Sequence, residues 1–298
     1  MMHEIRKYKY SGRVDTEDLN ERIHQQIQDF NGQTKAPVII GFSSEEGIKR
    51  NKGRLGAKEA PFKVREKLSS YAYNDTLYDA GTIIGDEDLE ASQKSLAEKL
   101  AEIYEVSSRP IIIGGGHETL YGHYLGIRQI FDGKLAILNF DAHFDLRDER
   151  PSSGTMFHQI LTADNDVDYY VLGLQKQGNT KTLYDTADRF NVNYYSIDDV
   201  RETAAADTVF KQLRDYDTVI MTLCMDSVEA ATAPGVSAMT PNGYTAIEIH
   251  NLIAKFSKLD NLKSFDISEV SPPLDENDRT SALAASIIYK FLSVNPFN

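Results

Sequence analysis

Apolar and polar positions follow two different spacings along this chain. Eight short runs rich in Val, Ile and other apolar residues predict strands. They cover Ala36–Phe42, Thr76–Ile84, Arg109–Gly115, Leu135–Asp141, Tyr169–Leu174, Asn193–Ile197, Thr218–Met225 and Leu262–Ile267. Segments with helical spacing lie between most of them, at Ala60–Leu68, Asp88–Val106, Thr119–Ile130, Thr182–Phe190, Asp207–Tyr216, Ile247–Lys258 and Thr280–Ser293.

This alternation predicts an α/β fold. A strand, a helix and a second strand in succession build a parallel sheet with helices on both faces. The 298 residues contain no internal repeat, low-complexity tract or Pro/Ser-rich linker that would divide the chain. We therefore expect one domain, residues 1–298, around a central, mostly parallel, eight-stranded sheet.

Composition excludes several classes of function. The content of 41% hydrophobic and 26% charged residues is typical of a soluble globular enzyme. A net charge of −13 would repel a phosphate backbone, so no nucleic-acid partner is expected. No apolar run reaches the roughly 18 residues of a membrane helix, and Met1–Tyr10 is polar, which predicts a cytoplasmic protein without a membrane partner. The single cysteine fits a reducing compartment.

Three of the predicted strands end close to side chains of the types that can bind metal ions. These are His117, the alternating residues Asp141, His143 and Asp145, and the pair Cys224 and Asp226. Alternate residues of an extended strand project from one face. In open α/β sheets, ligands bind outside the carboxyl ends of the strands, where neighbouring loops meet. We therefore expect the three clusters to form one metal site.

The residue types in these clusters indicate the chemistry of the site. Carboxylates and imidazoles suit Mn²⁺, Fe²⁺ or Zn²⁺, and a carboxylate-rich set favours Mn²⁺. Five or six such ligands can hold two ions about 3.5–4 Å apart and activate a water, which implies hydrolysis. Taken singly, His117 would more often be a loop residue than a ligand, and the Asp141 cluster reads equally as a solvated strand end. It is the coincidence of three clusters that favours a metal site.

Four segments, in order, carry a family resemblance. They are Gly114–Glu118, Asp141–Asp145, Cys224–Asp226 with Ala233–Gly235, and Asp266–Glu269 with Asp278–Thr280. Together they resemble the signatures of the ureohydrolases, the arginase and agmatinase superfamily, from about residue 36 to the C-terminus. The resemblance implies a three-layer arginase-type fold, two Mn²⁺ ions and hydrolysis of a C–N bond in a guanidino or amidino group.

The resemblance also implies a role for each site residue. One ion would be bound by His117, Asp141 and Asp145, and the other by His143 and Asp226, with Asp141 bridging. Cys224 stands where most ureohydrolases have a second bridging Asp, and the alternative is that it packs beside the site without contacting metal. Glu269 matches the acidic residue that faces the cationic group of the substrate.

Within the superfamily the chain most resembles the formimidoylglutamases, which release formamide from N-formimidoyl-L-glutamate in histidine degradation. The segments Ser11–Asp15, Arg50–Ala57, Asn139–Arg147 and Ser152–Gln159 carry this resemblance. Where arginases have a histidine for proton transfer, this chain has Phe157, and His158 follows one place later. That difference argues against an arginase.

The expected substrate carries two carboxylates, which favours cationic partners in the site. Arg54 and Arg147 are candidates because a guanidinium binds a carboxylate through two hydrogen bonds. Ser153 and Thr155 offer hydroxyl donors, and Asn51 belongs to the same set. Two alternatives stay open: an agmatinase or guanidinobutyrase type of hydrolase, and a metal-poor, non-catalytic homologue. The family's habit suggests a homo-oligomer, a trimer or hexamer.

Overall fold

A single twisted sheet runs through the molecule. The computed structural model describes residues 3–16, 19–33, 35–106 and 109–294, and within them ten strands form one sheet in the order β1-β4-β3-β5-β10-β9-β6-β7-β8, with β2 beside β4. Eight of these are the predicted strands. Their bounds are β3 (Val38–Ser43), β4 (Tyr78–Ile84), β5 (Pro110–Ile113), β6 (Leu135–Phe140), β7 (Val167–Leu174), β8 (Asn193–Ser196), β9 (Thr218–Cys224) and β10 (Leu262–Ser268).

The expected count of eight strands is too low by two. The additional strands are β1 (Ile5–Arg6) and β2 (Gln28–Asp29), and two residues are too few to show an alternating pattern. β1 pairs antiparallel with β4, whereas β2 and the eight predicted strands pair in parallel. The predicted mostly parallel α/β sheet is therefore confirmed.

The seven predicted helices are present, with ends that differ from the predicted ones by at most three residues. They are α3 (Ala60–Leu68), α4 (Leu89–Glu105), α5 (Thr119–Arg128), α7 (Lys181–Arg189), α9 (Ala205–Leu213), α10 (Ala246–Phe256) and α11 (Arg279–Val294). The sequence pattern missed four short helices: α1 (Ile23–Gln26), α2 (Glu46–Arg50), α6 (Met156–Ala163) and α8 (Ile197–Glu202). Ile197, expected to end a strand, begins α8 because Ser196 and Asp199 form a capping box there.

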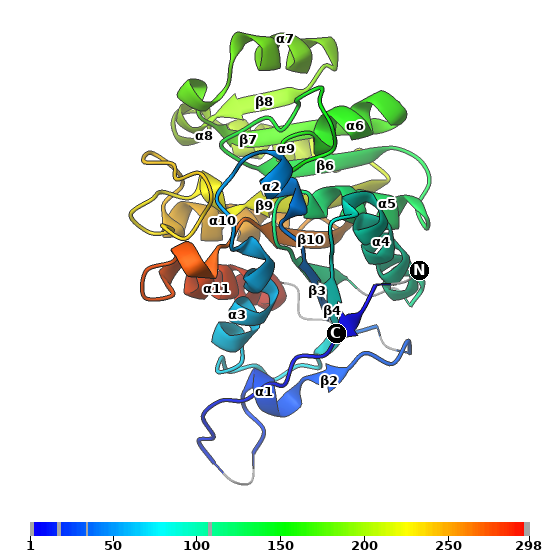
Figure 1. Ribbon diagram of the computed structural model, residues 1–298, viewed down its shortest axis with the longest axis vertical. Helices are drawn as coiled ribbons and strands as arrows, with labels where there is room; N and C mark the ends of the chain where they lie inside the picture. Colours follow the sequence, from blue (N-terminus) through cyan, green and yellow to red (C-terminus); the bar gives the residue numbers. More distant parts are fainter. Residues whose placement is uncertain (1–2, 17–18, 34, 107–108, 295–298) are drawn as a thin grey trace.

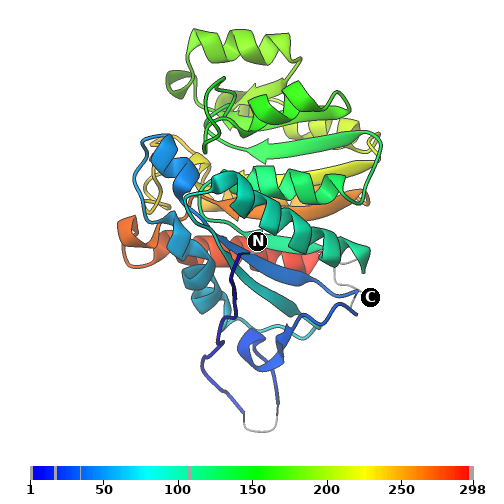
Figure 2. The same ribbon diagram turned by 45° about the vertical axis from the view of Figure 1, so that its right-hand side comes forward.

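The sheet separates two layers of helices, as Figures 1 and 2 show. Alternate residues of each inner strand enter opposite cores: Ala136 and Leu138 of β6 face one, and Ile137 faces the other. Helices α3, α8, α9, α10 and α11 supply the first core, and α4, α5, α6 and α7 the second. Both faces of the sheet are thus buried, which leaves the ends of its strands free to carry polar side chains.

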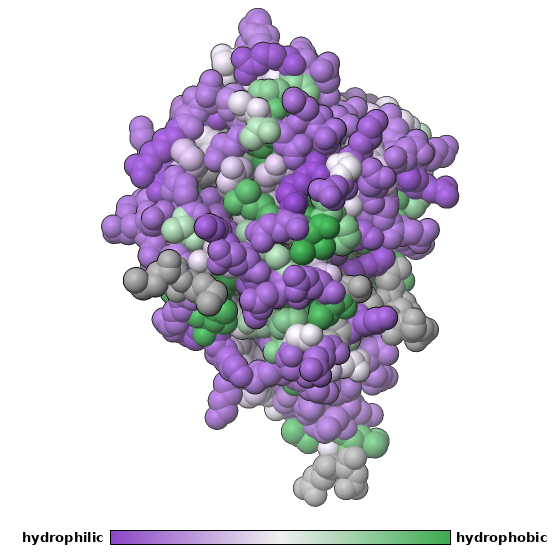
Figure 3. Space-filling model, turned by 90° about the vertical axis from the view of Figure 1, so that its right-hand side faces the viewer, coloured by the Kyte–Doolittle hydropathy of each residue, from purple (hydrophilic) through white to green (hydrophobic). Residues whose placement is uncertain are grey.

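The face in Figure 3 is mostly hydrophilic, with apolar side chains scattered over it. Among the helices of the described residues, none combines the length and the apolar character that crossing a membrane requires.

A buried ion pair joins α3 to β4 and yields a first prediction. The Arg65 side chain is fully buried and donates to both oxygens of Asp79, at 2.8 and 2.9 Å. Removing one partner leaves an uncompensated buried charge, which costs about 3–5 kcal/mol. We expect Asp79→Asn to lower the free energy of unfolding by about 3 kcal/mol, as measured by urea denaturation.

The matched control for this prediction is Asp29→Asn. Asp29 pairs with Lys7 on the surface, where both side chains are more than half exposed. Exposed pairs contribute about 0–1 kcal/mol, so this variant should unfold almost like the parent. Equal losses of unfolding free energy in the two variants would show that the buried ion pair stabilises the fold no more than the exposed one.

Candidate metal centre

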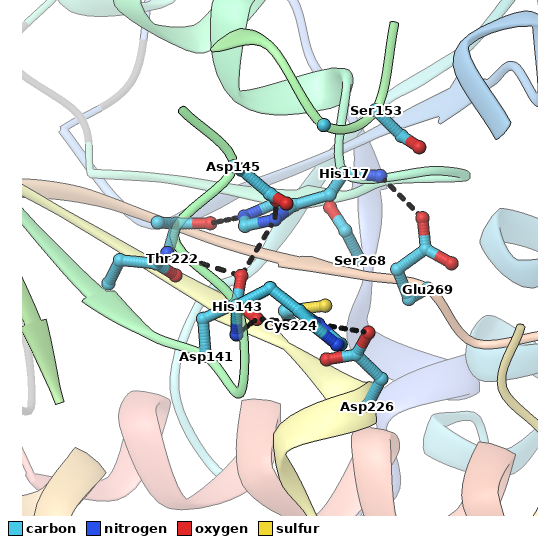
Figure 4. A network of polar contacts seen from close by, with 12 residues as sticks. His117, Asp141, His143, Asp145, Ser153, Thr222, Cys224, Asp226, Ser268 and Glu269 are labelled. Carbon is cyan, nitrogen blue, oxygen red and sulfur yellow. Dashed lines mark hydrogen bonds and ion pairs between the residues drawn. The ribbon is translucent and has the colours of Figure 1, made fainter. Parts of the chain in front are cut away.

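Four neighbouring strands deliver the polar side chains of the site to one edge of the sheet. In the order β5, β10, β9, β6, each ends next to a site residue: His117 after β5, Glu269 after β10, Cys224 at the end of β9 and Asp141 after β6. Figure 4 shows these side chains pointing toward one another. The predicted convergence at the strand ends is therefore present in the structure.

Close backbone packing explains the glycine run that precedes His117. A Cβ atom on Gly115 would lie 1.8 Å from the carbonyl oxygen of Ser44, in the loop after β3. One on Gly116 would lie 1.9 Å from Oε2 of Glu118. Only glycine fits the approach to the Ser44 backbone, whereas the contact at Gly116 is with the end of a side chain. The run thus brings His117 between β3 and β10.

Asp141 lies at the centre of the cluster and is fully buried. Its Oδ2 is 3.1 Å from Nδ1 of His117 and accepts a hydrogen bond of 3.2 Å from Nδ2 of Asn139. Its Oδ1 accepts the backbone N–H of His143 at 2.8 Å and is 3.6 Å from the Nδ1 of that residue. One carboxylate therefore touches both histidines of the site.

The remaining predicted ligands complete two groups around Asp141. Nδ1 of His117 is 2.9 Å from Oδ2 of Asp145, and Nδ1 of His143 is 3.3 Å from Oδ2 of Asp226. Two sets of three side chains offer ligand atoms within 4.8 Å of one another. They are His117, Asp141 and Cys224, and Asp141, His143 and Asp226. The site thus has the form of two adjoining ligand sets that share Asp141.

The electrostatics of the cluster show that it suits a cation. Burial, followed by repulsion from Asp141 and Asp226, raises the pKa of Cys224 well above its usual range. Burial and Asp141 raise the pKa of Asp145 to about 6. Burial and Asp226 raise the pKa of Glu269 well above its ordinary value. A bound cation would relieve this crowding of acidic groups.

A buried atom without a partner points to the same conclusion. Oδ1 of Asp226 is buried and has no hydrogen-bond partner among the residues that the structure describes. Leaving such a group unpaired is costly, whereas a metal ion would satisfy it. The donor set contains carboxylate oxygens, two imidazoles and one thiol, which fits Mn²⁺ apart from the sulfur.

Two site residues have a strained backbone. Glu269 has a φ of 69° and Asp145 a φ of 50°, in the left-handed region that non-glycine residues occupy at a cost of about 1–3 kcal/mol. The backbone N–H of Glu269 donates to the carbonyl of Gly115 at 2.8 Å, and its Oε1 accepts the N–H of His117 at 2.9 Å. These bonds hold the Glu269 carboxylate against the cavity.

A cavity of about 140 Å³ adjoins the cluster. Three of the predicted substrate-binding residues line it: Asn51, Arg147 and Ser153. Nη1 of Arg147 donates to Oδ1 of Asn51 at 2.6 Å, and Nδ2 of Asn51 donates to Oγ of Ser153 at 3.2 Å. The three side chains thus form one connected polar group on the wall of the cavity.

The other two predicted substrate-binding residues do not line the cavity. Nε and Nη2 of Arg54 donate to the carbonyls of Ser237 and Val236, at 2.8 and 2.7 Å, so its guanidinium holds the chain after β9. Thr155 is fully buried, and its Oγ1 accepts the backbone N–H of Ser152 at 2.9 Å. In this structure Arg54 supports a loop and Thr155 fixes the start of α6, and a contact of either residue with substrate stays a prediction.

The sequence reasoning missed the part of the cavity wall that follows β7. Gly178 and Asn179 line the cavity there. Nδ2 of Asn179 donates to the carbonyl of Ala142 at 2.9 Å, and its Oδ1 accepts the N–H of Phe144 at 3.0 Å. Asn179 thereby fixes the loop that carries His143. The rule that loops after parallel strands meet was the one available signal for it.

An α/β sheet with a carboxylate and histidine cluster at its strand ends is an arrangement that suits a metal-dependent hydrolase. The family model described as "Arginase family" matches residues 35–293, and the chain belongs to the arginase family. A formimidoylglutamase of Lysinibacillus sphaericus is 41% identical, over 96% of this chain and 95% of that one.

Two solved structures resemble the whole architecture. The crystal structure of a formimidoylglutamase from Bacillus subtilis matches with a TM-score of 0.86 and 26% identity, over 96% of each chain. That of a Trypanosoma cruzi formiminoglutamase with Mn²⁺ matches with a TM-score of 0.80 and 25% identity, over 87% of this chain and 92% of that one. The three-layer arginase-type fold inferred from the sequence is confirmed.

Proposed function

We propose that this protein hydrolyses N-formimidoyl-L-glutamate to L-glutamate and formamide, as a step of histidine degradation. One observation carries the proposal: the same cavity presents acidic side chains, Glu269 among them, at one place and Arg147 at another. The formimidoyl group is a cationic amidine, which suits a carboxylate, whereas the glutamate end is anionic and suits an arginine. The names and full-length similarity of the relatives support the same substrate.

The proposal includes a centre of two Mn²⁺ ions. The ligands would be His117, Asp141, Asp145 and Cys224 for one ion and Asp141, His143 and Asp226 for the other. The support is the shared position of Asp141 between both sets of ligand atoms. The T. cruzi formiminoglutamase with Mn²⁺ agrees in fold. Bound Mn²⁺ would lower the pKa of a coordinated water and act as a Lewis acid on the substrate.

The chain's own residues would orient the substrate for this reaction. Glu269 would pair with the amidinium, with its carboxylate held by the N–H of His117. The bond between the amidine carbon and the glutamate nitrogen breaks, the oxygen of water enters formamide, and glutamate leaves as the amine. Phe157 takes no part in proton transfer, because its side chain has no acidic or basic group. Its buried ring stacks on that of Tyr169, with the ring centroids 3.5 Å apart.

Substrate binding by Arg147 is testable. We expect Arg147→Ala to raise KM for formimidoylglutamate about 10- to 100-fold, because a charged hydrogen-bonded pair contributes about 1.5–3 kcal/mol. The value of kcat should change little, since the glutamate end is remote from the bond that breaks. Steady-state assays of glutamate release with the Mn²⁺-loaded enzyme measure both constants.

Arg150→Ala is the control for that variant. Arg150 is an exposed arginine three residues away that does not line the cavity, so its removal should leave KM unchanged. Arginine and agmatine serve as competing substrates, and each should be turned over far more slowly than formimidoylglutamate. A higher kcat/KM for either of them would overturn the proposed substrate.

The proposal extends to the state of the protein in the cell. We propose a cytoplasmic homo-oligomer, a trimer or hexamer. The support is the habit of the family and the single, buried, free cysteine, which suits a reducing compartment. Light scattering of the purified protein measures its mass, and a monomer at micromolar concentration would contradict the oligomer.

A further inference from the structure

A chain of buried hydrogen bonds leads away from the metal centre behind His117. Nε2 of His117 lies 3.0 Å from Oγ1 of Thr222, and Thr222 Oγ1 donates to Oδ1 of Asp266 at 2.7 Å. On the far side of Asp266, its Oδ2 is 2.7 Å from Nδ1 of His123. All four side chains are at most 1% exposed. Figure 4 shows the first link, with Thr222 beside the His117 ring on the side away from Glu269.

The direction of each hydrogen bond follows from the acceptor in the middle. A carboxylate has no proton to give, so Thr222 and His123 both donate to Asp266. The Thr222 hydroxyl has one proton, and Asp266 takes it. The same oxygen must therefore accept when it meets His117, which places a proton on Nε2 of that ring.

The hydrogen bonds at the far end of this network also run toward Asp266. Tyr104 donates its hydroxyl proton to Oγ of Ser264 at 2.6 Å, and Ser264 Oγ is 2.5 Å from Nε2 of His123. With the tyrosine as donor, Ser264 gives its own proton to Nε2 of His123. Nδ1 of His123 then keeps its hydrogen for Asp266. From both ends, the protons point toward Asp266.

We propose that Thr222 and Asp266 are positioning residues that keep the proton of His117 on Nε2 and thereby reserve Nδ1 for the metal. Nδ1 is the nitrogen that lies 2.9 Å from Asp145 and 3.1 Å from Asp141, in the proposed ligand set. In the imidazolium both nitrogens carry protons, and Thr222 accepts the Nε2 proton in either form. The inference rests on the proposed metal centre but not on the proposed substrate.

The proposal has a measurable consequence for metal binding. Partners that hold the second nitrogen of a metal-binding histidine typically change metal affinity by about 10- to 100-fold when they are removed. Without Thr222, the His117 ring could turn or carry its proton on Nδ1. Metal binding would then have to restore the ring orientation and the proton position, which would weaken the observed metal affinity. Catalysis would then suffer through lost metal, not through lost contact with substrate.

The first test is made on the parent protein, and a variant serves only to assign its signals. Protein with ¹⁵N-labelled histidine is loaded with Cd²⁺, which is diamagnetic, and the ring nitrogens of His117 are assigned by difference from His117→Asn. We expect a slowly exchanging proton on Nε2 and a metal-shifted Nδ1. A proton on Nδ1 with the metal on Nε2, or an Nε2 without a proton, would overturn the proposal.

The second test uses variants and measures free Mn²⁺ by electron paramagnetic resonance. We expect Thr222→Val to weaken binding of one ion at least about tenfold, Asp266→Asn to weaken it similarly, and Thr222→Ser to restore it. Thr218→Val is the control, because Thr218 is also a buried threonine of β9, four residues away, and no contact joins it to His117.

Each outcome of the second test decides the question. Unchanged affinity in Thr222→Val, or an equal loss in Thr222→Ser, would show that the hydroxyl does not position His117. If Thr222→Val does not fold, the Cd²⁺ experiment on the parent protein still decides where the proton lies. Neither measurement uses formimidoylglutamate, so a wrong substrate assignment would leave both results intact.

Discussion

Replacing Asp141 by asparagine should empty the metal centre and lower kcat by at least about 10³-fold. Asp141 belongs to both sets of ligand atoms, and its two oxygens lie on the sides of His117 and His143. Lewis-acid and water activation by the metal supply several kcal/mol of transition-state stabilisation, and each 1.36 kcal/mol is a factor of ten in rate. The asparagine fits the same space but offers one neutral oxygen and no negative charge.

The expected readout is a metal stoichiometry that falls from two ions per chain toward none. It is measured by elemental analysis after gel filtration, alongside steady-state rates. Asp148→Asn is the matched control, because Asp148 follows the same strand but is 83% exposed and lies outside both ligand sets. Two tightly bound ions in Asp141→Asn would remove the basis for a shared, bridging carboxylate.

The second large effect is expected at Cys224, the residue that departs from the usual carboxylate. Its side chain is only 2% exposed and belongs to the ligand set with His117 and Asp141. Mn²⁺ prefers oxygen to sulfur, so an aspartate at this place should bind at least as tightly as the thiol. We expect Cys224→Ala to lose one ion and about 10²-fold in activity, and Cys224→Asp to keep both ions.

The thiol also makes metal occupancy depend on pH. Burial and the repulsion by Asp141 and Asp226 raise the pKa of Cys224 well above its usual value, so the thiol of the metal-free protein is protonated at neutral pH. Ligation requires the thiolate. Occupancy of one ion should therefore rise as the pH rises or as Mn²⁺ is added in excess. In Cys224→Asp the dependence should move to lower pH.

Titration of metal content against pH in the parent and the aspartate variant checks this expectation. Oxidation of the thiol should inactivate the parent and spare Cys224→Asp, which controls for damage elsewhere. The alternative is a small buried residue that packs beside the site. An alanine variant with two bound ions, an unchanged rate and the pH profile of the parent would establish that alternative.

Local patterns in the sequence were enough to predict the framework of this protein. The spacing of apolar residues in runs such as Leu135–Phe140 and Ala60–Leu68 reflects how each segment buries one or both faces, and that is a property of the segment itself. The ends of parallel strands meet at one edge, so the convergence of His117, Asp141 and Cys224 also followed from the pattern.

The tertiary structure decided which polar side chains work together. Arg54 and Arg147 look alike in sequence, yet the guanidinium of Arg54 holds the carbonyls of Val236 and Ser237, whereas Arg147 lines the cavity. Asn179 and Thr222 have no signature of their own; each gains its role from a partner on another strand or loop. A loop side chain points where packing between distant segments allows, and no local pattern contains that information.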